Sequence, residues 1–121
     1  MWSNATIIII IVSILWLGGI NKATYSNETL LNISKSLTNK LPLPYGFPII
    51  TVRNKEEFNN VWEVITDKIF KNDVNRNVIA VNQWSYYAVK YYTESVLQYG
   101  NRIQKKQLRN FVRLIDHNRL I

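Results

Sequence analysis

The chain of 121 residues contains no cysteine, a single histidine and four glycines. Without cysteine it cannot form a disulfide framework, a zinc ribbon or an iron–sulfur cluster, and it offers no thiol nucleophile. The single histidine, His117, excludes a metal site built on several imidazoles, and no serine stands in a G-x-S-x-G sequence. There is also no P-loop and no G-x-G-x-x-G sequence. The composition therefore argues against an enzyme and predicts no catalytic residue, metal or cofactor.

Charged side chains are absent from the first 21 residues, and the first one is Lys22. The apolar block from 5 to 20 would be about 24 Å long as a helix, against a hydrocarbon core of about 30 Å. Trp2 and Trp16 stand near its two ends, as interfacial tryptophans do. We predict that residues 1–21 form an uncleaved signal-anchor. The residues that form the membrane anchor are Ile7, Ile8, Ile9, Ile10, Ile11, Val12, Ile14, Leu15, Trp16 and Leu17.

Two alternatives to the anchor stay open, namely a cleaved signal peptide and a segment buried in the core. The sequence after Leu17 offers no clean pair of small residues for signal cleavage, so we prefer the anchor. The lysines that follow it favour a cytosolic domain under the positive-inside rule. Against this, Asn27 and Asn32 begin N-x-S/T sequons, which are acceptors for N-glycosylation. We expect the domain on the non-cytosolic side.

The pattern of apolar residues predicts helices and two short strands after the anchor. Three or four residues separate the apolar positions of the first predicted helix, and Pro-rich 41–48 cannot continue it. Asn54 and Glu57 resemble a capping box ahead of a clearly amphipathic helix. The predicted helices span 27–40, 55–71, 85–99 and 102–117, and the predicted strands span 49–52 and 78–81. A strand also stays open for the first half of 85–99.

Strand, helix and strand in this order predict a right-handed βαβ unit. The expected fold class is therefore α/β (or α+β), a small helix-rich domain with a short two-stranded βαβ core behind an N-terminal transmembrane helix. The expected organisation is an anchor over 1–21, a helix and Pro-rich connection over 22–48, and a small α/β domain over 49–121.

Six aromatic residues between 84 and 99 exceed what one face of one helix can bury. Tyrosine and tryptophan are favoured in protein interfaces, because each ring is apolar with one polar tip. The alternative is that half of them pack in the core. We predict an interaction surface formed by Trp84, Tyr86, Tyr87, Tyr91, Tyr92 and Tyr99.

Most of the excess positive charge lies at the C-terminus. From Arg102 onward there are six basic side chains and one acidic one, whereas 22–101 holds nine and seven. Such a helix suits anionic lipid or an acidic partner, with a plain solvated face as the alternative. An anchored chain does not favour nucleic acid. The predicted basic face consists of Arg102, Lys106, Arg109 and Arg113, spaced four, three and four apart.

The layout combines a short N-terminal anchor, a Pro-interrupted strip from Leu41 to Pro48, and an Asn-, Ile- and Tyr-rich domain with Tyr92 to Gly100 as its aromatic core. In these features the chain resembles the small, N-terminally anchored envelope proteins of large insect DNA viruses, of the baculovirus per os infectivity factor type. The resemblance implies a virion-envelope protein that acts within a multi-protein complex in the insect midgut. It assigns no functional residue.

Together these observations predict a single-pass membrane protein that is a non-enzymatic subunit of a membrane or envelope complex. Its expected partners are the membrane and other proteins of that complex, with no small-molecule substrate. Two alternatives are a secreted soluble effector or ligand after signal cleavage, and a small accessory subunit of an organellar membrane complex.

Overall fold

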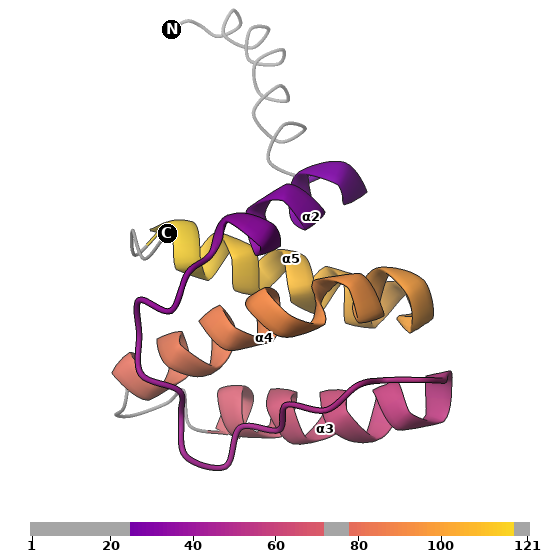
Figure 1. Cartoon of the computed structure of the whole chain (residues 1–121), viewed down its shortest axis with the longest axis horizontal. Helices are drawn as coiled ribbons and strands as arrows, with labels where there is room; N and C mark the ends of the chain where they lie inside the picture. The colour runs from indigo at the N-terminus through magenta and orange to yellow at the C-terminus, as the bar shows by residue number, and fades with distance from the viewer. Residues whose placement is uncertain (1–24, 72–77, 118–121) are drawn as a thin grey trace, which may run out of the picture.

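The computed structural model describes residues 25–71 and 78–117, which form helices α2 (Asn27–Ser36), α3 (Lys55–Lys71), α4 (Val78–Tyr99) and α5 (Arg102–His117). In Figure 1, α3 and α4 run antiparallel, and α5 turns back along α4 after a short link. The residues between α2 and α3, 37–54, carry no helix or strand, and we call them the connector. The connector descends from α2 and then follows α3 (Figure 1).

Helix α4 is the centre of the domain, because it packs against α2, α3 and α5. Six consecutive residues, 84–89, are buried, so this stretch has no solvent face. A helix surrounded on several sides loses the one-sided apolar pattern of a surface helix. This explains why a strand could not be excluded from the sequence for the first half of 85–99.

Helices α3 and α5 meet through large aromatic side chains. The rings of Trp62 and Phe111 lie 5.6 Å apart between centroids, and the Trp62 indole N–H donates to Gln107 Oε1 at 2.8 Å. Leu30 of α2 and Phe47 of the connector are buried in the same core cluster. The described residues thus share one core, to which α2 and the connector both contribute.

The predicted α/β class with a βαβ core is wrong, because the described residues are helical and contain no strand. The predicted strand 78–81 is the first turn of α4, where the low helix propensity of Val and Ile costs only a few tenths of a kcal/mol per residue. The predicted strand 49–52 lies in the connector without a neighbouring strand, and Ile49 and Ile50 are about half exposed. Residues 78–81 are therefore part of α4 itself, and 49–52 is held by α4 through the hydrogen bond from the Ile50 N–H to the Tyr92 hydroxyl.

The other helix predictions agree with the structure to different extents. The bounds of α3 and α5 coincide with the predicted 55–71 and 102–117, α4 begins seven residues before 85, and α2 ends at Ser36 rather than at 40. The Ser26 side chain accepts a hydrogen bond from the Thr29 N–H and so caps α2. At the other end Leu37 takes an extended conformation and is buried, which stops the helix.

The predicted anchor, residues 1–21, lies outside the described residues. None of the helices within 25–71 and 78–117 combines the length and the apolar character needed to cross a membrane.

Candidate functional site

The structure separates the six aromatic residues of the predicted interaction surface. Tyr91 is 40% exposed, and Tyr99 is half-buried. The other four are in the core and are not available to a partner on the folded domain: Trp84, Tyr86, Tyr87 and Tyr92.

The tyrosines of α4 other than Tyr91 face the connector. Four hydroxyls each donate a hydrogen bond to a connector carbonyl: Tyr86 to Thr38, Tyr87 to Leu41, Tyr92 to Pro48 at 2.7 Å, and Tyr99 to Arg53 at 3.2 Å. The order of the carbonyls follows the order of the tyrosines, so the connector runs along α4 in the same direction. A buried carbonyl without a partner is costly, and a segment outside helices and sheets has few backbone partners. The tyrosines supply these partners.

Two further hydrogen bonds and one ring contact complete this bracing. The Ile50 N–H donates to the Tyr92 hydroxyl at 3.0 Å, and the Lys90 ammonium donates to the Leu37 carbonyl at 3.0 Å. The Phe47 ring inserts against α4, with its centroid 5.0 Å from that of Trp84. The surplus of aromatics is thus used mainly to hold the protein's own connector. No local pattern in the sequence signals these pairs, because their members lie more than 35 residues apart.

The outer side of the connector carries apolar side chains into solvent. A β-turn is closed by the Phe47 N–H, which donates to the Pro44 carbonyl at 3.1 Å, and Gly46 has φ 83°, as type II turns require. Tyr45, at the tip of this turn, is 100% exposed. Leu43, Ile49 and Ile50 are each about half exposed. The connector therefore presents a partly apolar outer surface, while its inner side is hydrogen-bonded to α4.

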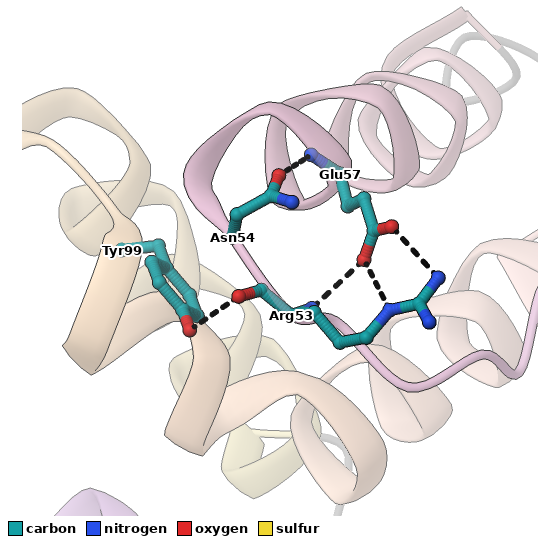
Figure 2. Close-up of polar contacts among 4 residues, drawn as sticks. All are labelled: Arg53, Asn54, Glu57 and Tyr99. Atoms are coloured by element: carbon teal, nitrogen blue, oxygen red, sulfur yellow. Dashed lines mark hydrogen bonds and ion pairs between the residues drawn. The ribbon is translucent and has the colours of Figure 1, made fainter.

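A polar cluster fixes the junction of the connector and α3 (Figure 2). Asn54 Oδ1 accepts from the Glu57 N–H at 2.9 Å, which is half of the predicted capping box. The Glu57 carboxylate does not return to the N–H of Asn54, but accepts from that of Arg53 at 2.8 Å and pairs with its guanidinium at 3.0 Å. These hydrogen bonds hold the pKa of Glu57 below its ordinary value. The bond from the Arg53 side chain has the larger effect, and the bond from its backbone N–H has the smaller one. The Tyr99 hydroxyl then bonds to the Arg53 carbonyl.

A hollow of about 550 Å³ lies between the connector and α3. Its lining combines Ile50, Thr51, Asn60 and Val61 with the Arg53–Glu57 pair. Because that pair is internally neutralised, the hollow offers no free charge to orient a substrate. Within the described ranges, no group of three His, Asp or Glu side chains converges to hold a metal ion.

The predicted basic face stands on the solvent side of α5. Arg102, Lys106 and Arg113 are exposed, and Arg109 is half-buried. The core side of the helix carries Leu108, Phe111, Val112 and Ile115, all of them buried. The four basic residues lie on one face of the helix, opposite these core residues, and their role as a binding face stays a prediction.

Both predicted glycosylation acceptors lie on α2 with exposed side chains. Asn27 is in its first turn, and Asn32 is one turn further on. The folded domain has room for a glycan at either position. His117 ends α5.

The described part of the chain is thus an all-α domain with a braced connector and a basic helix. Comparison of the chain with protein families, with characterised proteins and with solved structures finds no match. The resemblance to insect-virus envelope proteins consequently stays a prediction.

Proposed function

We propose that the chain is a single-pass membrane protein whose helical domain is a non-enzymatic binding subunit of a membrane or envelope complex. The domain stands on the non-cytosolic side and binds through surfaces that its own core leaves free. In the form suggested by the resemblance, the membrane is a virion envelope and the complex serves oral infection of an insect host.

The observation that carries this proposal is the position of a folded domain directly after the apolar block. The block ends at Ile20, and Tyr25 already packs against the core of the domain. Even fully extended, the intervening chain reaches at most about 17 Å. An anchor of this kind would hold the domain at the bilayer surface and raise the effective concentration of partners there.

The candidate surfaces support binding rather than chemistry. The outer side of the connector and the basic face of α5 are exposed. In contrast, Tyr86, Tyr87 and Tyr92 are buried, and their hydroxyls are bonded to the connector. Glu57, the carboxylate beside the hollow, is engaged by Arg53. Arrangements that catalyse reactions usually need a nucleophile or base aimed into a cavity, and the sequence supplies few groups of that kind.

Carbonate extraction of membranes that contain the full chain, followed by protease protection, tests the proposal. We expect the chain to resist carbonate and the domain to be protected inside sealed vesicles. Two variants, Asn27→Gln and Asn32→Gln, report sidedness independently through loss of a glycan. Release by carbonate, with an intact mass that lacks about 20 N-terminal residues, would replace this proposal by the secreted soluble alternative. An anchored chain without glycan at either asparagine would favour the organellar one.

A further inference from the structure

The basic face of α5 forms a straight stripe of charge on the side of the helix away from the core. Arg102 and Arg113 mark its ends, and at 1.5 Å per residue the stripe is about 16 Å long. Lys105 flanks it and is half-buried. The helix carries one acidic residue, Asp116, near its C-terminal end.

The charges of this stripe are not neutralised by the domain. Within the described residues, Arg102, Lys106 and Arg109 take part in no ion pair. Arg113 donates to the neutral amide oxygen of Asn110 at 2.8 Å and so keeps its net charge. A surface with several negative charges would therefore gain attraction without breaking a pair inside the protein.

An exposed apolar side chain stands beside this stripe. Ile103, next to Arg102 in the first turn of α5, is 68% exposed. The apolar face of α5 itself packs in the core, so Ile103 is the apolar side chain of this helix that could reach the acyl boundary while headgroups receive the charge.

We propose that α5 docks along an anionic lipid surface, with Arg102, Lys106, Arg109 and Arg113 toward the headgroups and Ile103 at the acyl boundary. The inference rests on the anchor of the proposed function and not on its sidedness, since the occupant is the leaflet that faces the domain, and it requires acidic headgroups in that leaflet. The charge of the stripe is complementary to acidic headgroups. The short chain between Ile20 and Tyr25 keeps the domain close to them. Each base near such a surface strengthens docking by about fivefold.

The absence of cysteine from the chain allows a single probe at this site. The Ile103→Cys variant of the full chain carries one fluorophore and is reconstituted into nanodiscs that contain a trace of headgroup nitroxide lipid. One set of discs is pure phosphatidylcholine, and the other contains phosphatidylserine on both sides. We expect quenching in the phosphatidylserine discs alone, and its loss at high salt because salt screens exposed charges.

Two charge-matched triple variants test the role of the stripe. Arg102→Gln, Lys106→Gln and Arg113→Gln together remove three exposed charges from α5 and should weaken docking about a hundredfold. Lys35→Gln, Lys40→Gln and Lys68→Gln remove the same charge from exposed positions elsewhere and should leave quenching nearly unchanged. All six side chains are exposed, so both variants should fold.

The readouts distinguish this inference from the proposed function. Retention in phosphatidylcholine discs through carbonate reports the anchor alone. A chain that is lost from those discs but is quenched on phosphatidylserine vesicles would refute the anchor and support docking by α5. Equal quenching in both lipids, or equal behaviour of the two triple variants, would overturn the docking inference. Binding of soluble poly-glutamate to α5, without quenching in phosphatidylserine discs, would also overturn the docking inference. It would indicate that the basic face binds an acidic protein.

Discussion

The Tyr92 hydroxyl of α4 donates a hydrogen bond to the Pro48 carbonyl at 2.7 Å, across 44 residues of sequence. The same hydroxyl accepts from the Ile50 N–H at 3.0 Å, so one buried side chain satisfies a donor and an acceptor of the connector. This contact shows how an irregular segment is held without a neighbouring strand.

Replacement of this hydroxyl should weaken the fold. Tyr92→Phe leaves the Pro48 carbonyl and the Ile50 N–H without their partner, and we expect a loss of about 1–3 kcal/mol in the free energy of unfolding. Urea denaturation of the full chain in detergent, followed by circular dichroism, measures the loss. Tyr45→Phe is the matched control, because Tyr45 is fully exposed and should change stability by less than about 0.5 kcal/mol. Equal stability of the two variants would contradict the bracing role of Tyr92.

Stability should also fall in alkaline solution. Burial raises the pKa of Tyr92, and it raises that of Tyr87, whose neighbours Tyr86 and Tyr91 add a smaller effect. Because folding favours the neutral phenols, their contribution is fully present below the ordinary tyrosine pKa of about 10 and declines as pH rises beyond it. Denaturation curves between about pH 8 and pH 11 should show this decline. The decline should be shallower in Tyr92→Phe, and an identical slope would contradict the prediction.

The start of α5 depends on a reciprocal cap. Asn101 Oδ1 accepts from the Gln104 N–H, and Gln104 Oε1 accepts from the Asn101 N–H, both at 2.8 Å. We expect Asn101→Ala to cost about 0.5–2 kcal/mol of unfolding free energy, and Asn101→Ser to restore most of it. Asn39→Ala, at an exposed connector position, serves as the control for loss of an amide side chain. A cost no larger than that of the control would show that the cap contributes nothing.

The packing of α5 on the core is tested by two residues of one helix. Leu108 has no exposed surface, whereas Ile103 is 68% exposed. Leu108→Ala should lower the free energy of unfolding by about 2–5 kcal/mol because it removes buried methyl groups and leaves a cavity. Ile103→Ala should change it by less than about 0.5 kcal/mol. Similar values for the two variants would refute the orientation of α5.

The turn of the connector requires a positive φ at Gly46. A Cβ at this position would meet no atom within 4 Å, so the cost of Gly46→Ala is the backbone strain of φ 83° alone. We expect about 1–2 kcal/mol of destabilisation by urea denaturation. Gly46→Asn should cost less, since asparagine tolerates this conformation better. If neither Gly46→Ala nor Gly46→Asn changes the free energy of unfolding, the turn does not have a positive φ at this position.

The structure shows where local sequence patterns are sufficient and where they fail. Helix α3 and helix α5 each pack one face on the core, so their 3.6-residue pattern predicts their bounds correctly. Helix α4 is buried over 84–89 on every side, and its β-branched start at Val78 looked like a strand. The spacing of the four basic residues places them on one side of α5, whereas four of the six aromatics that the sequence predicts at a surface are in the core. The carbonyl partners of their hydroxyls lie too far away in sequence for a local pattern to reveal them.

The sequence alone therefore determines the amphipathic helices, the basic stripe of α5, the uncharged N-terminal block and the lack of cysteine chemistry. These properties depend on residue type and on short-range spacing, which the chain carries with it before it folds. Only the tertiary structure decides that 49–52 and 78–81 are not strands and that the tyrosines of α4 brace the connector. Both outcomes depend on which backbone groups find hydrogen-bond partners once α4 lies at the centre, and contacts between distant segments settle that.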